Sequence, residues 1–146
     1  MRAFREAVEA HDLDAAVALL AEDVVFTSPV VFKPYAGRAI TAAILRAVAE
    51  VFEDFCYVRA IDDAGGRDHA LVFTARVGDR EIEGCDFLHV DDDGLIDSFT
   101  VMVRPLSGAQ ALAAAMGARF EQIARQAGQA GQTGQAGQAG QAADPA

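Results

Sequence analysis

Cysteine and long apolar runs are the scarcest features of this 146-residue sequence. Its two cysteines, Cys56 and Cys85, are too few for a disulfide framework and lack the Cys-x-x-Cys spacing of a redox or zinc motif. We interpret each as a small buried residue rather than a nucleophile. No apolar run approaches the ~18 residues of a membrane-spanning helix, and the first residues form a charged amphipathic pattern instead of a signal-peptide core. We therefore expect a cytoplasmic protein.

Positive charge is also scarce. The chain has 12 Lys and Arg residues against 22 Asp and Glu residues, which gives a net charge of −10 at pH 7. An acidic surface repels nucleic-acid phosphates and anionic lipids, so both are excluded as partners, and we interpret the acidity as a solubility feature. Hydrophobic residues are abundant by comparison, at 52% of the chain with 8% aromatic, which is enough for a continuous core and a cavity.

The common motifs of cofactor and metal chemistry are absent. The sequence has no Gly-rich phosphate loop, no Gly-x-Ser-x-Gly and no His-Glu-x-x-His. His11, His69 and His89 have no metal-ligand spacing between them, and we interpret them as surface or structural residues. The acidic run at 91–93 is typical of a calcium loop, but no Glu follows at the loop-end position, so a solvated hairpin tip is favoured. We expect no metal and no cofactor.

The apolar pattern predicts that helices come first and strands later. The predicted helices are 2–10, 13–20, 38–53 and 107–125, and the predicted strands are 24–27, 55–61, 69–77, 81–90 and 95–103. Turn sequences rich in Gly and Asp separate the late strands, which favours hairpins. This order predicts an α+β fold in which a curved antiparallel sheet wraps around the long helix and leaves a cone whose open end can hold a ligand.

The C-terminal segment has a different composition. From Gln126 onward, Gly, Gln and Ala repeat with a period of three residues. Such a period is typical of collagen, but the repeat is short and contains no proline before Pro145, so a triple helix is excluded. This composition cannot bury enough apolar surface to fold. We therefore predict a folded domain at 1–125 and a disordered Gly-Gln-Ala tail at 126–146.

Three segments carry a resemblance to a known family. They are residues 12–26 (DLDAAVALLAEDVVF), Ser28-Pro29 followed by Gly37 and a helix, and the late hairpin at 85–96 (CDFLHVDDDGLI). They resemble the SnoaL-like and ketosteroid isomerase branch of the nuclear transport factor 2-like superfamily, which has a cystatin-like fold. The resemblance covers residues 2 to about 105 and implies a cone with an apolar pocket for a small hydrophobic molecule. It does not fix the activity, because the fold hosts isomerases, cyclases, dehydratases, epoxide hydrolases and non-catalytic binders.

The resemblance extends only in part to catalytic groups. Steroid isomerases of this family use a carboxylate base just before the proline that follows the first strand, a tyrosine on the first helix and a protonated aspartate on a later strand. The matching positions in this sequence are Ser28, Phe4 and Asp86. A serine hydroxyl cannot replace a carboxylate as proton acceptor without a base of its own. We therefore do not expect the isomerase reaction to follow the family mechanism here.

Asp86 is the main candidate for a catalytic residue. Strand alternation places it with Ile82 and Gly84 on an otherwise apolar face, where an uncompensated carboxylate is costly to bury. One interpretation is an acid, base or hydrogen-bond donor in the pocket. The other is a structural carboxylate paired with Arg76 or Arg104.

The remaining candidates define the predicted pocket. Ser28 is either a hydroxyl that contacts the ligand or an ordinary strand terminator, and the predicted lining residues are Phe4, Phe32, Tyr35, Phe55 and Phe99. Three functions fit these residues: a cofactor-independent isomerase, lyase or hydrolase that uses Asp86, a module that binds a small hydrophobic molecule without turning it over, and an interaction protein that dimerises. A mixed apolar and polar outer sheet face favours a homodimer.

Overall fold

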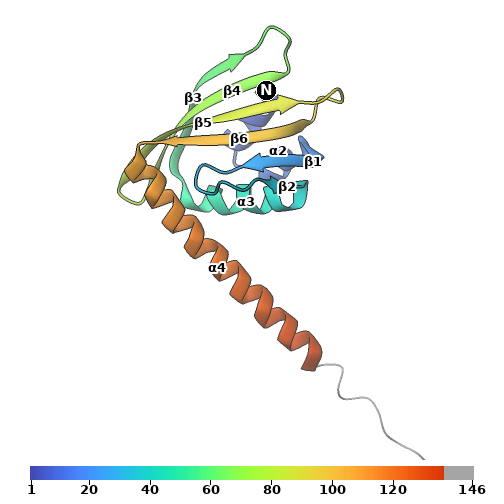
Figure 1. Cartoon of the computed structure of the whole chain (residues 1–146), viewed down its shortest axis with the longest axis vertical. Helices are drawn as coiled ribbons and strands as arrows, with labels where there is room; N and C mark the ends of the chain where they lie inside the picture. The colour runs from blue at the N-terminus through green and yellow to red at the C-terminus, as the bar shows by residue number, and fades with distance from the viewer. Residues whose placement is uncertain (137–146) are drawn as a thin grey trace, which may run out of the picture.

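The computed structural model describes the backbone of residues 1–136 and the side chains of residues 1–122. This part of the chain forms helices and strands in the order helix, helix, strand, strand, helix, four strands, helix (Figure 1). The helices are α1 (Arg2–Glu9), α2 (Leu13–Ala18), α3 (Arg38–Val51) and α4 (Leu106–Ala136). The strands are β1 (Leu20–Thr27), β2 (Tyr35–Ala36), β3 (Glu53–Asp62), β4 (Asp68–Val77), β5 (Arg80–Val90) and β6 (Ile96–Arg104).

The strands form one sheet in the order β2-β1-β6-β5-β4-β3. β1 and β6 are parallel neighbours, and every other neighbouring pair is antiparallel. Figure 1 shows the sheet curving over α3, with α4 leaving the end of β6 and running away from the sheet. The α+β cone predicted from the sequence is therefore confirmed, with one parallel pairing in a sheet expected to be antiparallel.

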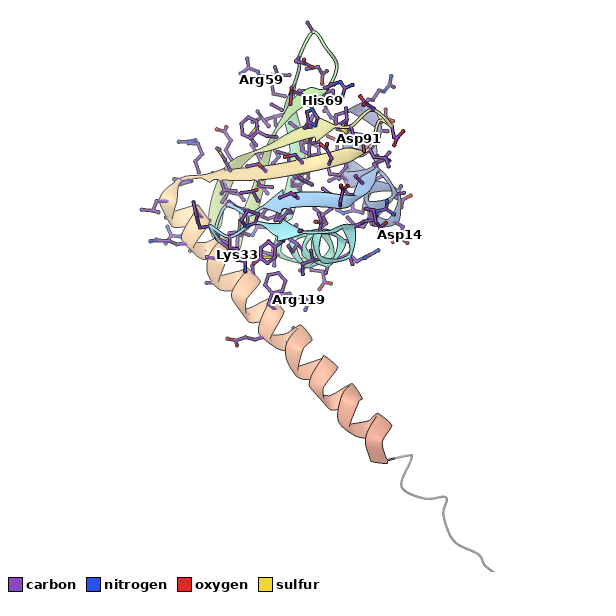
Figure 2. The ribbon with its side chains drawn as sticks, turned by 45° about the vertical axis from the view of Figure 1, so that its right-hand side comes forward. Asp14, Lys33, Arg59, His69, Asp91 and Arg119 are labelled. Atoms are coloured by element: carbon purple, nitrogen blue, oxygen red, sulfur yellow. The ribbon has the colours of Figure 1, made fainter. Side chains whose placement is uncertain are left out.

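The core lies on the inner, concave face of the sheet. Buried and less buried side chains alternate along β4 and β5, which confirms the alternation predicted around Asp86. Phe4, Phe73 and Phe99 are at most 1% exposed. The rings of Phe4 and Phe26 meet Phe99 edge-on, with centroid distances of 5.5 and 5.3 Å. Charged side chains, such as those of Asp14, Lys33 and Asp91, lie around the outside of the domain (Figure 2).

Two glycines allow close approach between layers. A Cβ atom on Gly84 of β5 would lie 2.2 Å from Cζ of Phe73, so only glycine leaves room for that ring on the inner face. A Cβ atom on Gly108 of α4 would lie 2.5 Å from Cγ2 of Ile82. The first turn of α4 therefore rests directly on β5, and this contact fixes where the last helix starts across the end of the cone.

Some expectations differ from the structure. α4 continues to Ala136, past the expected end near 125, because Ala and Gln are strong helix formers and offset the glycines among them. Residues 126–136 are thus helical in backbone, and the rest of the predicted tail, 137–146, lies outside the described residues. Cys56 is exposed and Cys85 is half-buried, since neither points to the inner face, so the predicted burial of both is wrong. Within residues 1–136, no helix is long and apolar enough to cross a membrane.

Candidate functional site

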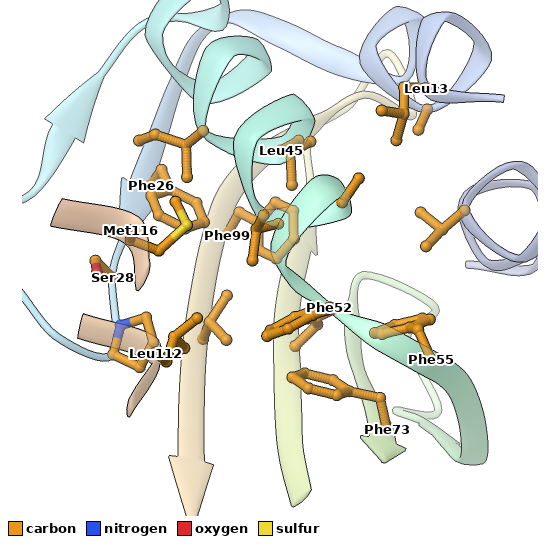
Figure 3. Close-up of a pocket in the computed structure, with 18 of the residues that line it drawn as sticks. Leu13, Phe26, Ser28, Leu45, Phe52, Phe55, Phe73, Phe99, Leu112 and Met116 are labelled. Atoms are coloured by element: carbon orange, nitrogen blue, oxygen red, sulfur yellow. The ribbon is translucent and has the colours of Figure 1, made fainter. Parts of the chain in front are cut away.

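A cavity of about 120 Å³ lies between the inner face of the sheet and the helices (Figure 3). Its walls come from α1 and α2 on one side, α3 facing the inner face of the sheet, the loop after β1, and α4 at the open end. The lining is largely aliphatic and aromatic. Its side chains with polar atoms are His11, Ser28, Tyr35, Tyr57 and Asp86. Among the described lining residues, Asp86 is the only carboxylate, and none is Lys or Arg.

Asp86 and Tyr57 form a hydrogen-bonded pair in this wall. Asp86 lies on the inner face of β5 and is 6% exposed, while Tyr57 lies on the inner face of β3 and is 3% exposed. The Tyr57 hydroxyl donates a hydrogen bond to Oδ2 of Asp86 at 2.6 Å, reaching across β4 between them. Nη2 of Arg5 donates to the backbone carbonyl oxygen of Tyr57 at 3.1 Å, which ties α1 to β3 at this residue.

Burial controls the protonation of this pair. Removal from water disfavours the charged carboxylate and raises the pKa of Asp86 to about 7, and the hydrogen bond from Tyr57 opposes that rise only in part. Burial, together with the nearby Asp86 carboxylate, raises the pKa of Tyr57, so its phenol stays protonated. Near neutral pH a large share of Asp86 is therefore a neutral acid. It accepts from Tyr57 on one oxygen and has one O–H to donate.

The predicted alternative, an ion pair between Asp86 and an arginine, is wrong. Nη2 of Arg76 lies 3.1 Å from Oδ2 of Asp54, and Nη1 of Arg104 lies 3.5 Å from Oε1 of Glu83. Both arginines are on the solvent side of the sheet, because their positions alternate with the buried ones. Asp86 thus faces a neutral phenol and apolar side chains instead of a cation.

Tyr57 is the functional candidate that sequence reasoning missed. It falls in the predicted strand at 55–61, and its two-residue spacing from Phe55 is the signal that could have placed both side chains on one face. The resemblance suggested a tyrosine on the first helix instead, at the position where this chain has Phe4. The pairing of Tyr57 with Asp86 depends on β3 and β5 both flanking β4, and no local pattern reveals that order.

Ser28 lies at the end of β1 on the cavity wall. Its Oγ accepts a hydrogen bond from the backbone N–H of Val30 at 3.1 Å, which closes the turn at Pro29. Ser28 therefore ends the strand, as one interpretation predicted, and it also borders the cavity, which a contact with a ligand would require. Its hydroxyl proton is not used by the bond to Val30 and remains available as a donor.

Most of the predicted aromatic lining residues border the cavity, and one does not. Phe4, Tyr35, Phe55 and Phe99 all contact it. The placement of Phe32 is corrected: its side chain is 100% exposed, because it lies in the loop before β2, where no strand pairing or covering layer turns it inward. The lining also includes side chains that were expected only as helix core; these are Phe52, Leu112, Met116 and Phe120.

Histidine and acidic side chains elsewhere serve local structure. Nδ1 of His89 lies 2.7 Å from Oδ1 of Asp97 across the β5–β6 hairpin. Oδ1 of Asp91 accepts hydrogen bonds from the backbone N–H groups of Asp93 and Leu95, each at 2.9 Å, which closes the hairpin turn. Among residues with described side chains, no three His, Cys, Asp or Glu groups are placed to hold a metal ion.

Comparisons with solved structures agree with this fold. A steroid delta-isomerase from Pseudomonas aeruginosa is 47% identical with a TM-score of 0.79, over 82% of this chain and 88% of that chain. A conserved bacterial protein with a cystatin-like fold from Silicibacter pomeroyi is 39% identical, also with a TM-score of 0.79, over 85% and 86% of the two chains.

A more distant structure supports the fold alone. It is a nuclear transport factor 2-like protein from Burkholderia xenovorans, 23% identical with a TM-score of 0.59, over 75% of this chain and 90% of that chain. The search of curated proteins found no match. Residues 1–99 match the SnoaL-like domain family. With most of its length in that match and two relatives above 30% identity, the chain belongs to the SnoaL-like family of the nuclear transport factor 2-like fold.

Proposed function

We propose that the protein binds a small, largely apolar carbonyl compound in the cone cavity, and that the neutral carboxyl group of Asp86 donates a hydrogen bond to the carbonyl oxygen. The observation that carries this proposal is the buried Tyr57–Asp86 pair in an otherwise apolar wall. Transfer of an apolar ligand from water into the cavity is favourable in free energy, and its single carbonyl oxygen needs one hydrogen-bond donor there. The free O–H of Asp86 meets that need.

The same arrangement supports acid catalysis. Negative charge that develops on a carbonyl oxygen during enolisation or elimination is stabilised by a donor that is already in place in a water-poor site. Tyr57 holds Oδ2 of Asp86 at 2.6 Å, so the carboxyl group does not need to reorganise when that charge appears. We propose a cofactor-independent isomerase, lyase or hydrolase in which Asp86 is the acid that polarises the substrate carbonyl.

The alternative is binding without turnover, and it is supported by the lack of a second carboxylate in the described lining. The related Pseudomonas aeruginosa protein is named as a steroid isomerase, and a double-bond shift also needs a proton acceptor. The lining described here has Ser28 just before Pro29 and no carboxylate besides Asp86. The proton would have to go to His11, which also lines the cavity, to a basic atom of the substrate or to a bound water. Without such an acceptor, the site only binds its ligand.

The dependence of affinity on pH tests the role of Asp86. With cyclohexenone as the probe, only the neutral acid donates to the carbonyl, so affinity falls as pH rises through about 7. Between pH 6 and 8.5 the expected weakening is about 30-fold, one factor of ten for each unit well above the pKa. Asp86→Asn should bind with no such dependence.

His11 also lines the cavity, so the titration is repeated in His11→Gln, which should keep the wild-type profile. A wild-type affinity that is flat from pH 6 to 8.5, or a profile that survives in Asp86→Asn, would contradict the proposed function. Turnover is measured separately, by exchange of the ring protons of cyclohexenone into deuterated water. Exchange that is lost in Asp86→Asn supports catalysis, and binding without exchange supports the binding module.

A further inference from the structure

Helix α4 closes the open end of the cone with one stripe of side chains. Leu112, Met116 and Phe120 follow each other at four-residue spacing and all line the cavity. Leu112 is 3% and Met116 is 6% exposed, while Phe120 is half-buried. Leu112 and Met116 therefore belong to the core that lines the cavity, and Phe120 is the most exposed side chain of the stripe.

Contacts at both ends of this stripe fix α4 in place. At its start, Gly108 rests on Ile82 of β5 without room for a side chain. Further along, Arg119 forms an ion pair with Glu50 of α3, so the helix is held on the sheet and on the central helix at once. A ligand that needed more space would have to break the second contact and lift the stripe from α3.

The volume that this stripe leaves inside the cone is small. The cavity measures about 120 Å³. An engineered cavity of about 150 Å³ in another protein binds one benzene ring, and pockets for drug-sized ligands begin at about 300 Å³. A cavity of this volume matches the size of a single six-membered ring.

We propose that α4 limits the ligand to a single-ring carbonyl compound, and that Met116 and Phe120 are the residues that set this limit. The inference rests on the proposed function, since it places the carbonyl group at Asp86.

A series of enones with the same head group tests the limit. Cyclohexenone has one ring, octalone has two and testosterone has four, and all three present the same conjugated carbonyl group to Asp86. The wild-type protein should bind cyclohexenone at least about tenfold more tightly than octalone and testosterone, although the larger probes offer more apolar area. Isothermal calorimetry at pH 6 measures the three affinities.

The variant Met116→Ala/Phe120→Ala should bind octalone at least about tenfold more tightly than the wild-type protein does, because truncating two side chains enlarges the cavity. Cyclohexenone should then no longer be the probe that binds most tightly. Phe120→Ala alone removes a half-buried ring, so this single variant replaces the double variant if the latter does not fold. It should also increase the affinity for octalone. The control is Leu106→Ala, which truncates an apolar side chain of the same helix that is 75% exposed and outside the cavity. It should leave all three affinities unchanged.

The outcomes separate the two proposals. If the wild-type protein binds testosterone as tightly as cyclohexenone, and this binding keeps its dependence on pH and Asp86, the size limit is wrong and the proposed function stands. If the wall variants leave the order of the three probes unchanged, the limit lies elsewhere and the assignment to Met116 and Phe120 is wrong. If no enone binds, or Asp86→Asn changes nothing, the proposed function fails and the limit fails with it.

Discussion

The tip and the inner face of the late hairpin place acidic side chains in opposite environments. At its exposed tip, Asp92 forms an ion pair with Arg67, and the hydrogen bond from that guanidinium lowers the pKa of the carboxyl group. Six positions earlier on the inner face, Asp86 has no cation, and burial raises its pKa to about 7. One short segment thus contains a carboxylate kept charged by a partner and a carboxyl group kept neutral by its surroundings. The position in the hairpin decides the chemistry, because Asp86 lies within β5 on the covered inner face, whereas Asp92 lies in the exposed turn after that strand.

The largest expected effect is a loss of stability, seen by comparing substitutions at neighbouring positions on the inner and outer faces of the sheet. Gly84→Ala places a Cβ atom 2.2 Å from Cζ of Phe73 and 2.8 Å from the backbone oxygen of Met102, so the backbone itself must shift. We expect it to lower the free energy of unfolding by about 3 kcal/mol. Cys85→Ala, on the outer side, should cost less than about 1 kcal/mol. Urea unfolding of both variants measures the contrast, and equal losses would mean that the inner face is not close-packed at Gly84.

The next effect is on the pH dependence of stability. The pKa of Asp86 rises from 3.8 to about 7 on folding, so between these values the folded protein binds more protons, and the free energy of unfolding falls as pH rises. Asp86→Asn should remove this fall, because its amide oxygen still accepts from Tyr57 without charge. We expect near-equality with the wild-type protein at pH 4 and an advantage of up to a few kcal/mol at pH 8, at ~1.4 kcal/mol for each unit of pKa.

The control for this comparison is Asp79→Asn, which changes an exposed carboxylate beside Arg80 and should behave like the wild-type protein at both pH values. If Asp86→Asn proves less stable than the wild-type protein at pH 8 by about 1–3 kcal/mol, the carboxylate is a structural anion. The contrast between the tip and the inner face would then disappear.

A smaller effect separates the contribution of the Tyr57 hydrogen bond to the pKa of Asp86 from the contribution of burial. The Tyr57 hydroxyl lowers the pKa of Asp86 against the larger effect of burial, so Tyr57→Phe should raise that pKa above about 7. Loss of the hydrogen bond should also cost about 1 kcal/mol of stability. Titration of the Asp86 carboxyl carbon by NMR measures the shift. Tyr35→Phe removes a hydroxyl elsewhere on the cavity wall and should leave the titration unchanged; an equal shift there would remove Tyr57 from the site.

The smallest effect on the domain itself concerns its outer face, where we expect a homodimer at micromolar concentration. Phe87 and Met102 lie there and are 42% and 60% exposed. Phe87→Ser should weaken self-association about tenfold, the usual scale for an aromatic contact in an interface, while leaving the melting temperature of the dilute protein nearly unchanged. Sedimentation velocity checks this against Leu106→Ser. A wild-type protein that sediments only as a 15.4 kDa species would exclude the dimer.

Local patterns in the sequence predicted the elements well. The dipeptide Gly78-Asp79 and the acidic turn at 91–94 are short-range signals, so the hairpins they connect follow from adjacent residues. The apolar spacing at 38–53 predicted α3 to within two residues of its end at Val51. Alternation placed Asp86 on the inner face for the same reason, because the direction of a side chain in a strand depends only on its position in the pleat.

The parts that sequence could not supply depend on distant residues. Tyr57 meets Asp86 only because β3 and β5 flank β4, and β3 shifts register between Tyr57 and Arg59. Phe32 is apolar like its neighbours in the lining, but the side on which a loop residue points has no periodicity to predict it. The stripe on α4 was visible as a helix face, whereas its position over the cavity depends on the contact of Gly108 with Ile82.

The parallel pairing of β1 with β6 has a consequence for how the chain folds. Val25 of β1 pairs with Ser98 of β6, so the sheet is complete only after the last strand has been synthesised. On the ribosome, β1 has only the two-residue strand β2 as a partner until nearly all of the family domain has been synthesised. Contacts of such long sequence separation slow folding, and an unpaired strand edge invites association in the meantime. The nascent chain should therefore acquire protection against proteolysis late and in one step, after β6 leaves the exit tunnel.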